Sequence, residues 1–306
     1  MKYNKLFGPI ILVLTAMIWG TAFVAQRVGM DSIEPLTFTA ARMILAAVVL
    51  GIPAVVIEFR SRKMLTSEAK ETVNKKTKYT LIGGTGCGAF LATATIFQQY
   101  GIVETSAGKA GFITALYMLL VPILSFVLFR KKGTWLVWTA VLIGVFGMYL
   151  LCVNEQFNIT RGDALLCVCA LLFSGHILFC DHFIELVNPL QMSAVQFATA
   201  SLISTVAAFI AEQPSWAKIL SAAIPILYCG LMSGGVAYTL QMVGQKYTDA
   251  TVASLLMSLE SVFAVLAGAV ILHERMSLRE ILGSIILFAA IILVQIPLPK
   301  KKKEKE

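Results

Sequence analysis

Long apolar runs separated by short clusters of charged residues dominate the hydrophobic pattern of this chain. The runs are much longer than the roughly 10 residues of a membrane β-strand, and their polar and apolar positions do not alternate. About 20 mostly apolar residues can cross the bilayer as a helix, which satisfies its own backbone hydrogen bonds. The pattern therefore predicts ten spanning helices, at 8–28, 36–58, 80–102, 108–129, 134–153, 163–182, 189–210, 222–245, 251–272 and 278–296.

Composition agrees with this prediction and excludes other classes. Of the 306 residues, 58% are apolar and 14% are charged, whereas a soluble domain has roughly 45–50% and about 25%. The net charge of +8 could suggest nucleic acid as a partner, but the ten helices leave no soluble domain to bind it. We therefore expect an all-α polytopic membrane protein with no nucleic-acid partner.

The basic residues predict how the chain crosses the membrane. Lys and Arg accumulate in cytoplasmic loops. With the N-terminus inside, most of the 25 Lys and Arg residues fall on the inner side, mainly in the segment 59–79 and the tail 297–306. We expect both termini in the cytoplasm, a location in the plasma (inner) membrane, and contact of both basic segments with anionic membrane lipid. The first apolar run is too long for a signal peptide, so it is expected to remain as a helix.

The second half of the sequence repeats the first. Residues 94–150 align without a gap on 237–293, a shift of 143, and Gln-x-x-Gly-x-x-x-Thr-x-Ala occurs at 98–107 and at 241–250. Upstream of these stretches a shift of 154 applies, which pairs Ala16 with Ala170. The change of shift falls where the first half carries its longer basic segment.

Each repeat then contains five spans, and this odd number has a topological consequence. The second repeat must enter the membrane from the opposite side, as the distribution of basic residues also indicates. Inverted repeats are typical of secondary transporters, in which two halves move about a site near the midplane. The predicted organisation is a first repeat at 1–153, a second repeat at 163–296 and a basic cytoplasmic tail at 297–306.

Several segments resemble the EamA-type members of the drug/metabolite transporter superfamily, over nearly the whole chain. They are IWGTAFVAQRVGM, FTAARMILAA and ETSAGKAGFITALYMLLVPILSF in the first half, and TDATVASLLMSLESVFAVLAGAVILHERMSLREILG in the second. The resemblance implies a ten-helix transporter of small organic metabolites, such as amino acids, amines, nucleosides or sugars. Similar members usually have Glu-Pro-Val where this chain has Glu260-Ser261-Val262, so a helix-kinking proline is missing.

Glu260, near the middle of the ninth span, is the first candidate site residue. A charged side chain at a helix centre costs roughly 2.5–3.5 kcal/mol even on the most lenient scale, and no cation lies one turn away on the same helix. Its repeat partner is Tyr117, which we expect to face it across the pseudo-twofold axis. We interpret Glu260 as a substrate- or proton-coupling group. The alternative is a protonated carboxyl group hydrogen-bonded to a neighbouring helix.

Gln98 and Gln241 form a second symmetric pair, with Thr95 and Tyr238 beside them on the respective helix faces. The Gly-rich runs GGTGCG and GLMSGG lie in corresponding places of the two halves. Gly-interrupted segments in such places indicate a transport site, although close helix packing explains them equally well. We expect these four polar side chains to face the substrate.

Arg42 and Trp19 complete the predicted substrate-binding residues. Arg42 either meets an anionic group or extends to the outer interface. Trp19, which aligns with Phe173, either forms a wall of the cavity or packs as an ordinary aromatic residue. A polar group near the inner end of the sixth span is interpreted as loop-side charges, with a proton path as the alternative: His176, Asp181, His182 and Glu185.

The six cysteines indicate neither a disulfide nor a metal site. All lie in predicted spans, where a free thiol behaves as a small apolar group. His176 and Cys180 share a helix face, but two ligands do not make a zinc site. We expect no disulfide, no metal and no cofactor.

The sequence thus predicts an alternating-access secondary transporter that exports an amino acid or amine, with proton coupling through Glu260. A facilitative uniporter or a channel for a small polar solute is the alternative. We expect no enzyme, since paired aspartates, HExxH and a Ser/His constellation are absent at membrane depth. The pocket is expected between spans 1, 3, 4, 6, 8 and 9. Spans 5 and 10 are expected at the periphery, as the face of a homodimer.

Overall fold

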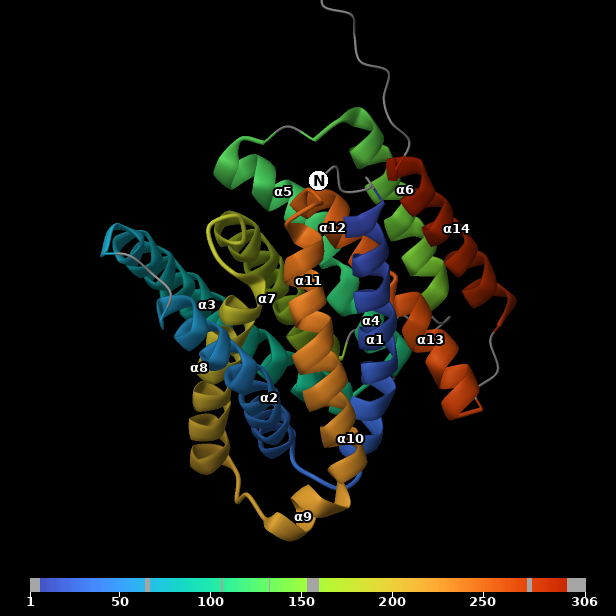
Figure 1. Cartoon of the computed structure of the whole chain (residues 1–306). Helices are drawn as coiled ribbons and strands as arrows, with labels where there is room; N and C mark the ends of the chain where they lie inside the picture. The colour runs from blue at the N-terminus through green and yellow to red at the C-terminus, as the bar shows by residue number, and fades with distance from the viewer. Residues whose placement is uncertain are drawn as a thin grey trace, which may run out of the picture.

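The computed structural model describes residues 6–63, 67–105, 107–131, 133–152, 160–273 and 277–295, and all regular secondary structure in these ranges is helical (Figure 1). Eight helical stretches are long and apolar enough to cross a membrane. Two shorter apolar helices, Trp135–Gly147 and Ile281–Leu293, complete the ten spans. The predicted fold class, an all-α membrane protein of two inverted five-helix repeats, is confirmed.

Some spans are single helices and others are divided. The first repeat contains α1 (Phe7–Gly29), α2 (Pro35–Lys63), α3 (Ser67–Val103), α4 (Ala107–Ala115), α5 (Tyr117–Phe129) and α6 (Trp135–Cys152). The second contains α7 (Arg161–Phe183), α8 (Pro189–Ala211), α9 (Trp216–Ser221), α10 (Ala223–Leu227), the π-helix η1 (Tyr228–Ala237), α11 (Tyr238–Gln245), α12 (Ala250–Met257), α13 (Glu260–Ile271) and α14 (Leu278–Gln295). The short helix α9, between two spans, is not predicted by the hydrophobic pattern.

Helix packing follows the repeat. The contact of α3 with α7 has its counterpart in the contact of α1 with η1 and α11. The remaining equivalent spans pack on each other, α2 on α8 and α6 on α14. The end of α5 and the start of α6 lie at the same end of the molecule as the start of α1, whereas α13 ends at the other (Figure 1). Equivalent points of the two repeats therefore lie at opposite ends, as an inverted repeat requires.

The basic segment 59–79 is not a loop where the structure describes it. α2 continues to Lys63 and α3 begins at Ser67, beyond the predicted helix ends. Neither Gly nor Pro occurs between residues 54 and 82, so nothing in the local sequence breaks either helix. The hydrophobic pattern marks only the apolar part of a helix, and here the helices continue into polar sequence. The tail 297–306 lies outside the described residues.

Two spans are broken at equivalent positions, between α4 and α5 and between α12 and α13. The residue just before the second segment is Leu116 in one repeat and Leu259 in the other, with backbone φ/ψ angles of −58°/−13° and −57°/−14°. Tightening to i→i−3 hydrogen bonds produces the break, as between the Ser261 N–H and the Ser258 carbonyl at 3.1 Å. The Ser261 hydroxyl also donates to that carbonyl, at 2.8 Å. The ninth span therefore breaks without the proline of similar sequences.

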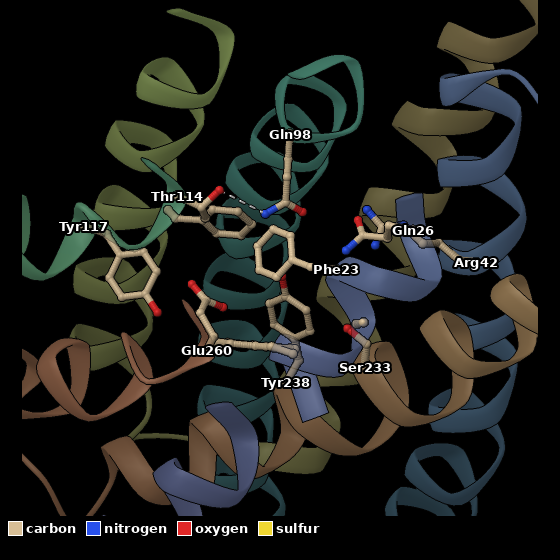
Figure 2. Close-up of a pocket in the computed structure, with 12 residues that line it drawn as sticks. Phe23, Gln26, Arg42, Gln98, Thr114, Tyr117, Ser233, Tyr238 and Glu260 are labelled. Carbon is tan, nitrogen blue, oxygen red and sulfur yellow. Dashed lines mark hydrogen bonds between the residues drawn. The ribbon is translucent and has the colours of Figure 1, made fainter. Parts of the chain in front are cut away.

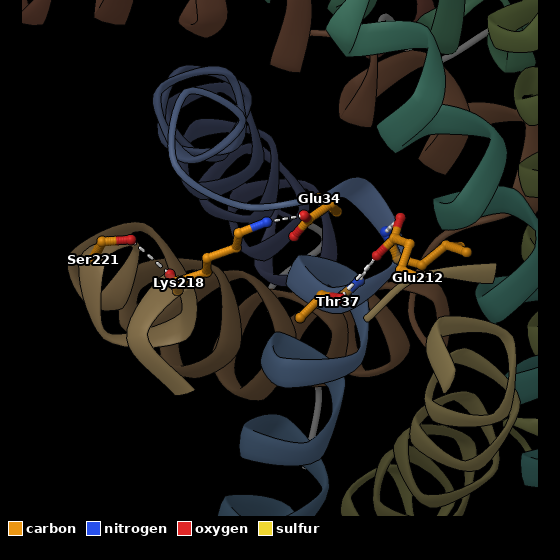
Figure 3. Close-up of polar contacts among 6 residues, drawn as sticks. Glu34, Thr37, Glu212, Lys218 and Ser221 are labelled. Atoms are coloured by element: carbon orange, nitrogen blue, oxygen red, sulfur yellow. Dashed lines mark hydrogen bonds and ion pairs between the residues drawn. The ribbon is translucent and has the colours of Figure 1, made fainter. Parts of the chain in front are cut away.

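Glu212, immediately after α8, caps the N-terminus of α2 in the other repeat. Its carboxylate accepts hydrogen bonds from the backbone N–H groups of Leu36 and Thr37, at 2.9 and 2.7 Å, and from the Thr37 hydroxyl at 2.8 Å (Figure 3). The first N–H groups of a helix lack partners within it and lie at the positive end of its dipole. Beside this cap, Lys218 of α9 forms an ion pair with Glu34. The two contacts join the repeats at one end of the molecule.

Candidate substrate cavity

A small polar cavity lies between the two repeats at the level of the helix breaks (Figure 2). Its free volume is about 30 Å³, which is room for roughly two water molecules. Both repeats contribute to its wall, which consists of Trp19, Ala22, Phe23, Gln26, Arg42, Gln98, Thr114, Tyr117, Phe173, Ser233, Tyr238 and Glu260. The predicted spans 1, 3, 4, 6, 8 and 9 all line it, and the second span adds Arg42.

Tyr117 and Glu260 lie together on one side of this cavity. They are the first residues of α5 and α13, directly after the two breaks, and both side chains are buried. The Tyr117 hydroxyl points towards the Glu260 carboxylate (Figure 2). Glu260 Oε1 and the Tyr117 hydroxyl have no hydrogen-bond partner in the described part of the chain.

Arg42 and Gln26 lie on the opposite side of the cavity (Figure 2). Arg42 is buried rather than extended to an interface, and its guanidinium lies 5.7 Å from the centre of the Phe38 ring. Among the described residues, Arg42 Nε and Nη2 and Gln26 Oε1 find no hydrogen-bond partner. Buried polar atoms normally have partners, so this side of the cavity can receive a polar ligand group.

Aromatic rings separate the two polar sides. Phe23 and Tyr238 lie between the Glu260 side and the Arg42 side (Figure 2). The rings of Trp19 and Tyr238 have their centroids 4.7 Å apart. Trp19 and its repeat partner Phe173 both line the cavity. The cavity thus has a carboxylate and a hydroxyl group on one side, a guanidinium and an amide group on the other, and aromatic rings between them.

The structure places two of the predicted residues off the cavity wall. Thr95 is buried, and its hydroxyl donates to the carbonyl of Leu91 in its own helix at 2.8 Å. Gln241 is buried but is not a lining residue, whereas Gln98 lines the cavity and its Nε2 lies 3.5 Å from the Thr114 hydroxyl. The symmetric glutamines thus do not share one environment, because the cavity does not lie evenly about the pseudo-twofold axis.

The Gly-rich runs serve close helix packing. A Cβ atom on Gly84 of α3 would lie 2.5 Å from Val195 Cβ of α8, and one on Gly230 of η1 would lie 2.7 Å from Leu45 of α2. Real Cβ atoms do not approach so closely, so glycine lets each pair of helices come together. Within the two runs, Ser233 alone lines the cavity. It lies in η1, and π-helical turns frequently mark functional sites.

Several lining residues were not predicted, although one signal was available. Trp19, Ala22, Phe23 and Gln26 are spaced i, i+3, i+4 and i+7, which is one face of a helix, and Gln26 is a polar residue within an apolar span. Thr114 and Ser233 carry no such signal because hydroxyl groups are common in membrane helices. The interpretation of His176 as a loop-side residue is wrong, since it is completely buried in α7.

Ten spans in two inverted repeats around a central polar cavity define a multi-pass membrane protein of the transporter class. The model of the EamA-like transporter family matches residues 6–153 and again 160–296. The chain therefore belongs to this family, and the predicted membership of the drug/metabolite transporter superfamily is confirmed.

Relatives and a solved structure agree with this assignment. An "Uncharacterized transporter" of Archaeoglobus fulgidus is 28% identical over 96% of this chain and 87% of its own length. The "Uncharacterized transporter YoaV" of Bacillus subtilis is 24% identical over 95% of this chain and 97% of its own length. A structure described as "Crystal structure of protein" aligns with a TM-score of 0.74 and 17% identity, over 94% of this chain and 96% of that one. This last likeness concerns the fold alone.

Proposed function

We propose that this protein exports a small zwitterionic metabolite of the amino-acid class across the plasma membrane by alternating access, with its termini in the cytoplasm. One observation carries the substrate class. Glu260 Oε1 and the Tyr117 hydroxyl lie on one side of the cavity, and Arg42 Nε and Nη2 lie on the other, all without a hydrogen-bond partner among the described residues. An ammonium group suits the first side and a carboxylate the second, since Arg binds carboxylates in a two-pronged geometry. The apolar part of the substrate would lie against the aromatic rings.

The size of the cavity supports alternating access. A free volume of about 30 Å³ admits water but no amino acid, so substrate enters only when the repeats separate. Polar contacts join the repeats at both ends. Glu212 and Thr37 meet at one end, at 2.8 Å, and Lys131 and Asp181 at the other, at 3.3 Å. Opening towards one side of the membrane would break the contacts at that end and keep those at the other end. A channel would instead need a continuous polar path.

Glu260 is the proposed proton-coupling group. Removal from water favours the neutral form of a carboxyl group, and a nearby cation favours the ionised form. An ammonium group arriving beside Glu260 would therefore release its proton, and departure of the substrate would allow a proton to return. No catalytic step is proposed.

Transport by purified protein in proteoliposomes tests this function. We expect saturable uptake of zwitterionic amino acids that responds to a pH gradient, and weaker or no uptake of nucleosides and sugars. Glu260→Gln preserves the shape of the side chain, and we expect it to retain facilitated exchange but lose the response to the gradient. An unchanged rate and pH dependence in this variant would exclude proton coupling through Glu260. Flux that does not saturate would favour the channel, and saturable flux that is independent of the gradient in the unmodified protein would favour the uniporter.

A further inference from the structure

A second buried cluster of polar side chains lies outside the cavity, between α3 and α7. Cys87 Sγ lies 3.3 Å from Cys180 Sγ, and Cys180 Sγ lies 3.9 Å from His176 Nδ1. One ligand atom from each of the three residues falls within 4.8 Å of the others. All three side chains are completely buried. We propose that Cys87, His176 and Cys180 bind a zinc ion that links α3 to α7.

The separations of these atoms suit a single ion. Zn–S bonds of about 2.3 Å and Zn–N bonds of about 2.0–2.1 Å, arranged tetrahedrally, hold two sulfur ligands about 3.8 Å apart and a sulfur and a nitrogen about 3.6 Å apart. The observed 3.3 and 3.9 Å lie within about half an ångström of these values, and all three ligand atoms lie within 4.8 Å of one another. Small side-chain rotations are sufficient to place all three atoms around one ion.

Gln196 of α8 orients the histidine for this role. Its Oε1 lies 2.9 Å from His176 Nε2. Because an amide oxygen can only accept, the ring proton lies on Nε2, which leaves the lone pair of Nδ1 available to a metal ion. Cys180 Sγ lies 3.9 Å from Nδ1 and 3.6 Å from Nε2, so a rotation of the ring is needed to direct Nδ1 at the ion. Metal-binding histidines almost always donate their second N–H group to such a partner. Gln196 is therefore a positioning residue for the site.

Charge favours a divalent ion such as zinc over a monovalent thiophilic ion. Zn²⁺ with two thiolates and a neutral imidazole has no net charge, which suits a site inside the membrane, where a net charge is expensive. A monovalent ion such as Cu⁺ in the same site would leave one negative charge. Binding releases the two thiol protons.

The inverted repeat gives an independent argument. At the shift of 154, His176 corresponds to Ala22, Cys180 to Gln26 and Gln196 to Arg42. The first repeat therefore holds the Arg42 guanidinium at the place where the second repeat holds this cluster. The third span also contributes a cysteine on both sides, since Cys229 lies beside Arg42. Equivalent places in the fold would thus both hold a cation, a guanidinium group in one repeat and a metal ion, neutralised by its thiolates, in the other.

The site would bear on transport because it adjoins the cavity. The ring centroid of His176 lies 6.0 Å from that of Tyr238 and 6.4 Å from that of Phe173, and both of these residues line the cavity. A zinc ion bound here also joins the two repeats through α3 and α7. The binding test itself does not depend on which substrate the protein carries.

Zinc content of the purified full-length chain tests the proposal. The protein is prepared under reducing conditions without a histidine tag, equilibrated with Zn²⁺, desalted and analysed by mass spectrometry for metal. We expect about one zinc ion per chain, and a thiolate-to-metal charge-transfer band when Co²⁺ replaces zinc. We expect Cys87→Ala and Cys180→Ala each to lose both signals. In a chelator competition, Gln196→Ala should weaken zinc binding by about 10- to 100-fold.

Cys169→Ala is the matched control, because Cys169 is also completely buried in α7 but lies outside the cluster. It should retain the zinc ion and the cobalt band. Should an alanine variant fail to give monodisperse protein, Cys87→Ser replaces it, since the hydroxyl fills the same space without binding zinc well. Unmodified protein without stoichiometric zinc would overturn the proposal. Equal zinc content in Cys87→Ala and Cys169→Ala would also overturn it.

Discussion

Tyr117 and Glu260 occupy the same position in the two repeats, each the first residue after a break in a spanning helix, and their side chains enter one cavity. The two breaks have nearly identical backbone angles at Leu116 and Leu259. The repeat thus places an acidic side chain and a hydroxyl group close together in space, although the two residues are 143 positions apart in the sequence.

The break before α13 should accept the proline of similar sequences. Ser261 lies in the first turn of α13, where proline is tolerated. We expect Ser261→Pro to lower the free energy of unfolding by about 1–2 kcal/mol, because it loses two hydrogen bonds to the Ser258 carbonyl, from the N–H and from the hydroxyl group. Val265→Pro, in the interior of the same helix, should cost about 3 kcal/mol or more. Thermal unfolding of both variants in detergent measures the difference. Equal losses of stability in the two variants would show that the break does not make position 261 more tolerant of proline than the interior of the helix.

Arg42 should discriminate between substrates by their carboxylate. We expect Arg42→Gln to raise the KM of an amino acid by roughly 10- to 100-fold, because one charge-assisted hydrogen bond contributes about 1.5–3 kcal/mol. The decarboxylated amine of the same side chain should be transported with an unchanged KM. Uptake of both compounds into proteoliposomes measures the ratio. Arg27→Gln is the control, since Arg27 is paired with Asp31 outside the cavity. A parallel loss for both compounds in Arg42→Gln would place its role in folding rather than recognition.

Removal of the Glu212 cap should destabilise the contact between the repeats. Glu212→Ala leaves the Leu36 and Thr37 N–H groups without their acceptor, and we expect the free energy of unfolding to fall by about 1–2 kcal/mol. Glu185→Ala removes an exposed carboxylate after α7 and should change it by less than about 0.5 kcal/mol. Unfolding temperatures of the two variants, measured side by side, test this expectation. Similar temperatures would indicate that water caps α2 equally well.

The Glu34–Lys218 ion pair should make stability depend on pH at the acidic end. The hydrogen bond from Lys218 is the largest factor that lowers the pKa of Glu34 below its ordinary value of 4.5. A lowered pKa means that the stabilisation is present above pH 4.5 and disappears as the pH falls through the folded-state pKa. Glu34→Gln should therefore unfold at a lower temperature than the unmodified protein near neutral pH, and the difference should shrink below about pH 4. A constant difference across this range would contradict the ion pair as its cause.

Local sequence predicted the membrane helices well because burial in lipid acts on each helix separately. Every span must be apolar over roughly 20 residues whatever its neighbours are. The same rule does not mark where a helix continues into water, so the extensions of α2 and α3 through the basic segment were missed. The break before Glu260 was also hidden, since serine hydroxyls and i→i−3 hydrogen bonds replace the expected proline there.

The cavity was predicted in part, according to how strongly each residue stands out. Glu260 and Arg42 are charged residues within apolar spans, so they could be assigned to a site without knowing which residues lie near them in space. Gln241 and Thr95 look similar in sequence to Gln98, yet the structure places them off the cavity wall. Residue spacing shows which side chains share one face of a helix. It does not show which other helix packs against that face.

The sequence by itself determined the number of spans, the inverted repeat and the family, because these depend on composition, periodicity and internal similarity along one chain. Only the tertiary structure decided which polar groups meet: Glu260 with Tyr117, Arg42 with Gln26, and Cys87 with Cys180 and His176. The physical reason is that these contacts join helices far apart in the chain. Their closeness results from how glycine-lined helices pack, and the spacing of residues along a single helix does not contain that information.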